Sequence, residues 1–420
     1  MWSITSNLSF FEVVVSLSLF VRRDLDIGLL SAICLGIGVG ITTIYSASYN
    51  WDLGLAGNIY EKQILWALLG FIAMIITMAI PLKLFYAFAY VLYGLTVTLL
   101  ILVLELGDRR WLNVGPIHIQ PSELAKITTV LVLARFLTYR NRDLTRVRAF
   151  IPPLLFVLVP ILLVFKQPDL GTALVFSILI LPMFFWAGAK PLHLFFLISP
   201  ALTLICAFHP WMLVAVVILL IGILFHERTR LSTAGILLLV NLAVAIAAPY
   251  VWENKLHDYQ KRRILTFLDP NIDKLGAGYQ VIQSKIAIGS GGLKGKGFLE
   301  GTQTKLAFLP EQHTDFIFSV ICEEFGFLGA FFVLALFVFI LWRALSIAVQ
   351  TKNRFSSLTA IGLATILFFH IFVNIGMTVG IMPVTGLPLP FLSYGGSTLI
   401  TNMILIGLLH NIYANRYEDY

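Results

Sequence analysis

The chain has 420 residues, of which 59% are hydrophobic and 12% are charged, and its mean hydropathy is +0.90. These values exclude an ordinary soluble globular domain, in which about 25% of residues are charged. The net charge of +7 does not indicate nucleic-acid binding, because no aromatic platforms or soluble domain accompany the basic clusters. We also expect no disulfide framework and no metal site, because the cysteines lie in apolar segments without CxxC spacing and the histidines are scattered.

Repeated apolar runs, each of roughly 16–27 residues, are long enough to cross the hydrocarbon layer as helices. Such runs must be helical, because lipid offers no hydrogen-bond partner for free backbone groups. We therefore predict an all-α, polytopic transmembrane protein whose residues 1–420 form a single integral membrane domain of about twelve spans. The spans are expected near residues 27–45, 63–80, 84–106, 121–138, 151–165, 171–187, 191–208, 211–225, 233–250, 316–342, 358–380 and 394–415.

The segment 1–26 precedes the first span. Its apolar run ends at Arg22 and Arg23, whereas a cleaved signal peptide carries its basic residues before the apolar core. We expect a cytoplasmic segment that lies at the membrane interface. With this start, most Lys and Arg residues of the short loops fall on the cytoplasmic side, in agreement with the positive-inside rule. Both termini are then cytoplasmic, and the long loop 251–315 is extracytoplasmic.

Polar residues are expensive inside a membrane, and two groups of them lie at span ends. The fourth span opens with Gln120, Ser122, Glu123 and Lys126. Glu123 and Lys126 are three residues apart, so they share a helix face and can form an ion pair. This pair is either a structural one that lowers the cost of burial or one charged wall of a cavity open to the outer face. Asp169, at the outer end of the fifth span, is expected to face the same cavity.

The stretch GSGGLKGKG at 289–297 is rich in glycine but matches neither a Walker phosphate loop nor the G-x-G-x-x-G pattern. In a Walker loop the lysine is followed by Ser or Thr, whereas Gly297 follows Lys296 here. Two interpretations stay open: a plain loop, or a flexible turn whose Lys294 and Lys296 can approach an anionic head group. The preceding segment 279–288 is predicted to form an amphipathic helix along the membrane surface.

The segment FLPEQHTDFIF, residues 308–318, closes the long loop and leads into an apolar run. Asp315 is its last charged residue and is therefore expected where the chain re-enters the bilayer. A carboxylate at this depth can act on a lipid head group but not on a freely soluble substrate. The alternative is that Thr314 or Asp315 caps the N-terminus of the following helix.

Several motifs, taken in chain order, resemble those of the SEDS proteins (shape, elongation, division and sporulation). They are GDRRWL at 107–112 with QPSELAK at 120–126, KQPDLG at 166–171, GYQ at 278–280 with QS at 283–284, FLPEQHTDFIF at 308–318 and PVTGLPLPFLSYGGS at 383–397. The resemblance covers nearly the whole chain. The stretches SKIAIGSGGLKGKG and GTQ, together with Thr385, resemble the elongation branch of the family more than the division branch.

The resemblance implies a peptidoglycan glycosyltransferase of the bacterial cytoplasmic (inner) membrane. Family members polymerise lipid II, the undecaprenyl-pyrophosphate-linked disaccharide-pentapeptide, and work with a class B penicillin-binding protein and the elongation machinery. The resemblance also implies that Asp315 is the essential carboxylate of a periplasmic loop and that Trp111 is important for activity. It implies that Glu123 and Lys126 form a pair near a central cavity. Family members usually have ten spans, so the region 188–232 is expected to be an added helical hairpin.

The reaction that this implies joins the 4-hydroxyl of an acceptor sugar to the anomeric carbon of a donor, and undecaprenyl pyrophosphate leaves. Asp315 is the candidate general base that removes the hydroxyl proton, and attack opposite the leaving group inverts the anomeric configuration. Lys or Arg side chains, or a divalent cation, would stabilise the leaving pyrophosphate, and no other cofactor is expected. The basic candidates are Arg109, Arg110, Lys126, Lys285 and Lys294, and the other cavity candidates are Gln120, Ser122, Asp169, Glu311 and His313.

Two other functions fit a polytopic chain with charged residues in its bundle: a lipid II flippase, and a non-enzymatic scaffold for a transpeptidase. The large outer loop argues against the flippase, because alternating access requires comparable gates on both sides and the cytoplasmic loops are short. Polymerisation of labelled lipid II by the purified protein separates the three functions.

Overall fold

The computed structural model describes residues 24–418, except 51–54, 107–109, 115–116, 140–146, 228, 230, 256–257, 270–271, 273–275 and 307. The interfacial helix expected before residue 24 and the candidate Arg109 therefore lie outside the described residues. The described chain is mainly α-helical. It also contains two short antiparallel hairpins, β1–β2 (Tyr49–Asn50 with Leu55–Ala56) and β3–β4 (Leu112–Val114 with Ile117–Ile119).

A helix lies at each of the expected span positions, and most helix ends fall close to the expected ones. In chain order they are α2 (Ile27–Ala47), α3 (Ile59–Ala79), α4 (Leu82–Leu106), α5 (Pro121–Thr138), α6 (Ile151–Lys166), α7 (Leu170–Trp186), α8 (Pro191–Cys206), α9 (Pro210–His226), α10 (Leu231–Asn254), α14 (Ile317–Gln350), α15 (Arg354–Val379) and α16 (Gly396–Ala414). The region 188–232, expected to be an added hairpin, forms α8 and α9, which pack on each other.

Among the described residues, seven helices are long and apolar enough to cross a membrane: α2, α3, α4, α10, α14, α15 and α16. The apolar helices α6 to α9 are shorter. α5 carries Glu123, Lys126 and Arg135, yet it is buried along nearly its whole length. Repeated apolar helices of this length define a multi-pass α-helical membrane protein.

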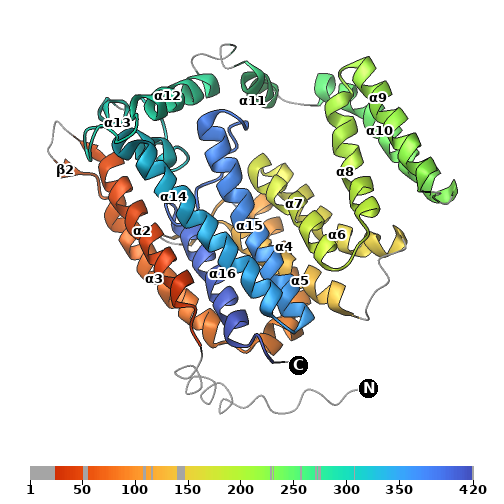
Figure 1. The fold of residues 1–420 in the computed structure, drawn as a ribbon, viewed down its shortest axis with the longest axis horizontal. Helices are drawn as coiled ribbons and strands as arrows, with labels where there is room; N and C mark the ends of the chain where they lie inside the picture. Colours follow the sequence, from red (N-terminus) through yellow and green to blue (C-terminus); the bar gives the residue numbers. More distant parts are fainter. Residues whose placement is uncertain are drawn as a thin grey trace.

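The centre of the bundle is formed by α5, α15 and α16, whose residues are mostly buried. α3 packs on α16, α4 packs on α5, and α14 packs on α15. The helices α8, α9 and α10 stand at one side of this bundle and pack mainly on one another (Figure 1). The molecule thus has a closely packed central bundle and a looser lateral group of three helices.

The two ends of α2 mark the two ends of the bundle. Near its start, Asp24 pairs with Arg416 at 3.2 Å, so the C-terminal segment lies at this end. At its other end, the carbonyl oxygen of Ala47 accepts a hydrogen bond of 2.7 Å from Gln312. A helix of this length spans roughly 30 Å. The loop that carries Asp315 and the C-terminus are therefore at opposite ends of the bundle.

The segment between α10 and α14 contains three short helices, α11 (Asp258–Leu268), α12 (Ala277–Ser290) and α13 (Thr302–Lys305). The helix predicted for residues 279–288 is confirmed as part of α12. In Figure 1, α12 lies across the end of the bundle where α14 begins. Ser284 of α12 donates a hydrogen bond of 2.6 Å to the carbonyl oxygen of Thr378 in α15, which ties this helix to the bundle.

The glycine-rich run 289–297 packs directly on the first part of α14. The backbone N–H groups of Lys296 and Gly297 donate to the carbonyl oxygens of Glu323 and Glu324, each at 3.0 Å. A Cβ atom at Gly295 would overlap the carbonyl oxygen of Glu324. The interpretation of this run as a flexible turn is therefore wrong: glycine is required because two backbones lie in contact.

Candidate functional site

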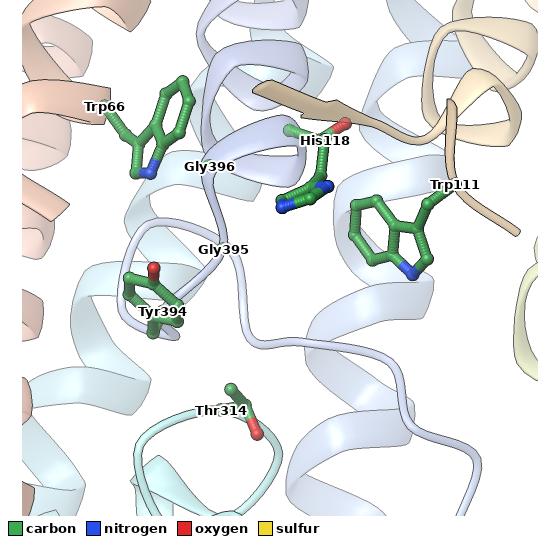
Figure 2. Close-up of a pocket in the computed structure, with 8 residues that line it drawn as sticks. Trp66, Trp111, His118, Thr314, Tyr394, Gly395 and Gly396 are labelled. Carbon is green, nitrogen blue, oxygen red and sulfur yellow. The ribbon is translucent and has the colours of Figure 1, made fainter. Parts of the chain in front are cut away.

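A cleft of about 470 Å³ opens at the end of the bundle that carries the Asp315 loop. Its walls come from four segments that are far apart in the sequence: α3, the β3–β4 hairpin, the loop before α14 and the start of α16. Figure 2 shows Trp66 and Trp111 on opposite sides, with His118 between them and Tyr394 on the same side as Trp66. The lining residues are Trp66, Trp111, His118, Thr314, Tyr394, Gly395, Gly396 and Ser397.

Asp315 follows Thr314, which lines the cleft, and its side chain is half-buried. Its Oδ2 atom lies beside Gly386, 3.5 Å from the position that a Cβ atom would occupy there. α14 begins at Ile317 and its N-cap residue is Phe316, so neither Thr314 nor Asp315 occupies the capping position. The capping alternative for these two residues is therefore not supported.

His313 and Glu311 belong to the same loop. The ring of His313 lies 5.9 Å from the ring of Tyr394, measured between centroids. Glu311 accepts a hydrogen bond of 3.2 Å from the hydroxyl of Thr314. The loop that carries Asp315 is thus in contact with the segment 393–397, where the late sequence motif ends and α16 begins.

A second polar cluster lies next to the cleft. Asp169 accepts hydrogen bonds from the N–H and hydroxyl of Thr172, at 3.1 and 3.0 Å, and so caps α7. Its Oδ2 atom also lies 3.6 Å from Arg110 and 3.3 Å from the side-chain nitrogen of Gln120. The backbone N–H of Gln120 donates to the hydroxyl of Ser397, which lines the cleft. The expectation that Asp169 faces the same region as Gln120 agrees with this geometry.

The ion pair predicted between Glu123 and Lys126 is confirmed. The Nζ atom of Lys126 lies 2.8 Å from Oε1 of Glu123, and both side chains are almost fully buried. The same Nζ atom lies 2.8 Å from Nε2 of His370 in α15. Neither Glu123 nor Lys126 lines the cleft, so the geometry favours a structural pair over a charged cleft wall. Ser122, also buried, has no hydrogen-bond partner for its hydroxyl among the described residues.

The other two lysine candidates do not line the cleft. Lys285 is exposed on α12, and its side chain lies against Gly380. Lys294 is exposed on the glycine-rich run, whereas its neighbour Lys296 forms an ion pair of 2.7 Å with Glu323. The sequence placed these lysines near an anionic head group, but tertiary packing leaves them outside the cleft lining, whereas Arg110 pairs with Asp169 next to the cleft.

Sequence reasoning identified Trp111 and the Asp315 loop but missed several residues of the cleft. Tyr394 and Ser397 lie in the motif at 383–397, so that motif was an available signal for them. Trp66 and His118 had no signal, because an aromatic residue in an apolar run and a lone histidine in a loop are ordinary features.

The fold and the cleft define a multi-pass membrane protein with an aromatic, polar cleft at one end of its bundle and a carboxylate next to it. A family model described as "Cell cycle protein", FTSW_RODA_SPOVE, matches residues 28–217 and 211–418. The chain belongs to this family, the SEDS proteins. The two matched segments meet within α9, in the region expected to be an added hairpin.

Relatives with known names agree with this assignment. The chain is 38% identical to the peptidoglycan glycosyltransferase MrdB of Escherichia coli K12, over 89% of this chain and 90% of the relative. It is 35% identical to the peptidoglycan glycosyltransferase RodA of Treponema pallidum, over 94% and 98%. Relatives named FtsW are 32–33% identical, so the elongation branch is the better match.

Solved structures show the same fold. A chain of a peptidoglycan synthase complex has a TM-score of 0.70 and 33% identity, covering 94% of this chain and 99% of the other. The rod shape determining protein RodA of Thermus thermophilus has a TM-score of 0.63 and 27% identity, covering 94% and 98%.

Proposed function

We propose that this protein is a peptidoglycan glycosyltransferase that polymerises lipid II during cell elongation, with Asp315 as the general base. The observation that carries the proposal is the position of Asp315. It follows Thr314 of the cleft and immediately precedes a helix that enters the bundle, in a chain whose relatives are named peptidoglycan glycosyltransferases. A carboxylate here can meet a sugar attached to a lipid carrier, because the lipid tail stays in the bilayer.

The walls of the cleft suit a sugar substrate. Its volume of about 470 Å³ lies within the range of small-molecule sites, roughly 300–1,000 Å³. Trp66, Trp111 and Tyr394 offer flat apolar faces, and His118 and Ser397 offer polar groups. The acceptor hydroxyl is a weak nucleophile until a base removes its proton, and a positioned carboxylate contributes about 10²–10⁴-fold to such a step. Attack opposite the leaving group gives an inverted product.

The leaving pyrophosphate requires positive partial charge nearby. The N-terminus of α16 begins at Gly396 on the cleft, and helix N-termini favour phosphate groups through their free N–H groups. Arg110, which is part-exposed beside the cleft, adds a full positive charge on this side. The described residues contain no group of three His, Cys, Asp or Glu side chains suited to hold a metal ion.

The proposal includes a location and partners. The protein lies in the bacterial inner membrane with about twelve spans, both termini cytoplasmic and the Asp315 loop periplasmic. The opposite positions of the C-terminal segment and the loop support this orientation. A class B penicillin-binding protein is the proposed partner, since a similar solved chain belongs to a complex in which polymerization and crosslinking are coordinated.

The test is polymerisation of fluorescent lipid II by the full chain in liposomes, alone and with the class B penicillin-binding protein of the same genome. We expect glycan strands from the wild type and a loss of about 10²–10⁴-fold in rate for Asp315→Ala. Asp24→Ala is the matched control, because Asp24 is an exposed aspartate at the opposite end of the bundle. Undiminished polymerisation by Asp315→Ala contradicts the base assignment. Lipid movement without polymer supports a flippase, and partner binding without either activity supports a scaffold.

A further inference from the structure

The backbone of the Asp315 loop is held by α15 and by the segment that joins α15 to α16. Three consecutive carbonyl oxygens, those of His313, Thr314 and Asp315, each accept a hydrogen bond from these two elements. The donors are the backbone N–H of Tyr394 at 2.9 Å, the hydroxyl of Ser393 at 2.6 Å and the side-chain amide of Asn374 at 2.9 Å. From this arrangement we infer that Asn374 and Ser393 are positioning residues for Asp315. The inference rests on the proposed function.

Asn374, on α15, is fully buried and uses its amide nitrogen twice. Nδ2 donates to the carbonyl oxygen of Asp315 at 2.9 Å and to that of Leu387 at 2.8 Å. The orientation of the amide follows from chemistry, because both partners are carbonyl oxygens and a flipped amide would present an oxygen to them. Asn374 therefore connects the Asp315 loop and the segment 383–395 through one rigid side chain.

Ser393 makes a similar connection from the other side. Its hydroxyl proton is directed to the carbonyl oxygen of Thr314, and its oxygen accepts from the backbone N–H of Leu389 at 2.8 Å. The hydroxyl is thus used once as donor and once as acceptor, and its side chain is buried. Ser393 holds the residue before Asp315, whereas Asn374 holds Asp315 itself.

The segment 383–395 can serve as a rigid support because it is itself anchored. Leu387, Leu389 and Leu392 are buried against the bundle. The Nδ1 atom of His370 lies 3.4 Å from the carbonyl oxygen of Pro388. Because the ammonium of Lys126 has only donors, Nε2 of His370 must accept from it, and Nδ1 then carries the proton that faces Pro388. The buried ion pair on α5 is thereby linked to the support beneath Asp315.

Such support matters for a general base, because the carboxylate must meet the acceptor hydroxyl within hydrogen-bond reach. A misplacement of about 1 Å can cost roughly 10²-fold in rate. Loss of either connection would move Asp315 without removing the cleft walls. The expected signature is a lower kcat at nearly unchanged KM for lipid II. Partial unfolding would also lower the apparent kcat, so each variant is compared with a matched control.

The test compares Asn374→Leu with Asn241→Leu in the full chain in liposomes with fluorescent lipid II. Leucine keeps the number of side-chain heavy atoms and the branching of asparagine, and it adds no charge beside Asp315. Asn241 is the matched control, because it is a buried amide on α10 that donates to Ser199 and to the carbonyl oxygen of Leu237, away from the cleft. We expect kcat to fall by roughly 10–100-fold for Asn374→Leu and to stay near the wild-type value for Asn241→Leu.

Two variants of Ser393 add a rescue test. Ser393→Ala removes the hydroxyl and is expected to lower kcat, whereas Ser393→Thr keeps the hydroxyl and is expected to restore part of the rate. Wild-type kcat in both Asn374→Leu and Ser393→Ala overturns the inference. So does an equal loss of kcat in Asn374→Leu and Asn241→Leu, because the effect would then be loss of stability alone.

Hydrogen–deuterium exchange separates this inference from the proposed function. We expect faster exchange of the amides in 308–318 for Asn374→Leu than for Asn241→Leu, whatever reaction the protein catalyses. Unchanged exchange in this segment overturns the positioning role. If the wild-type protein polymerises no lipid II, the proposed function is contradicted. Faster exchange in Asn374→Leu would still support the connection between Asn374 and the loop.

Discussion

The helices α10 and α15 have nearly the same hydropathy, but they occupy very different places in the molecule. Of the most apolar 18-residue stretch of each, 78% is buried inside the protein for α15 and 11% for α10. α15 presents His370 and Asn374 to its neighbours, whereas the buried polar contact of α10 is made by Asn241. Apolar sequence alone provides little drive for one helix to pack on another in lipid, so polar contacts and close packing distinguish the two.

The central bundle and the lateral group α8–α10 therefore use polar residues for different purposes. In the central bundle, buried polar groups form linked networks that lead to the Asp315 loop. In the lateral group, Ser199, Thr203 and Asn241 form a local contact between α8 and α10. Substitutions in the two regions should therefore differ in both size and kind of effect.

The largest effect on stability is expected for Glu123→Ala. Removing one partner of a buried ion pair leaves Lys126 uncompensated, and such losses are typically about 3–5 kcal/mol in the free energy of unfolding. Chemical unfolding in mixed micelles measures this loss. The double variant Glu123→Leu with Lys126→Leu is the control, and we expect it to recover most of the stability. A double variant whose loss equals the sum of the losses from Glu123→Leu and Lys126→Leu alone would show that the pair is not coupled.

A smaller effect is expected for Gly295→Ala in the glycine-rich run. Gly295 has a φ of +79°, and an added Cβ would meet the backbone carbonyl of Glu324, so the two backbones must separate. Strain of this kind costs about 1–3 kcal/mol. Gly289→Ala is the matched control, because no atom lies near its Cβ position and it belongs to α12. If the two variants unfold alike, the run is not held against α14.

The smallest effect is expected for Thr203→Val in the lateral group. The substitution removes a hydrogen bond of 2.7 Å from the Thr203 hydroxyl to Asn241 while keeping the shape of the side chain. Interhelical hydrogen bonds in membranes contribute about 0.6 kcal/mol on average. Polymerisation of lipid II should be unchanged, and unfolding should shift slightly. A marked loss of activity would show that the lateral group contributes to the site.

Much of the fold could be predicted from the sequence, because a bilayer imposes a minimum length and an apolar composition on every spanning helix. The positions of α2 to α10 and α14 to α16 follow from that rule. The pairing of Glu123 with Lys126 was also predictable, since residues three apart share a helix face. The contact of Lys126 with His370 was not, because it joins residues on two helices that are far apart in the chain.

The residues of the site also divide into those that could be predicted from the sequence and those that could not. Asp315 could be located from the sequence, because it is the last charge before an apolar run. Lys285 and Lys294 were expected near the head group, but α12 and the glycine-rich run leave them outside the cleft. Trp66, His118 and Tyr394 meet only where distant segments converge, and no local pattern records which distant segments will meet.

By itself, the sequence determined that this is a helical membrane protein and where its helices and the Asp315 loop lie along the chain, because the bilayer sets a length and a composition for each spanning segment. Tertiary structure decided which helices are buried, which residues line the cleft and how Asn374 and Ser393 contact the Asp315 loop. These features depend on contacts between residues that the chain separates widely, and apolar helices of equal hydropathy do not differ in any local property that would reveal those contacts.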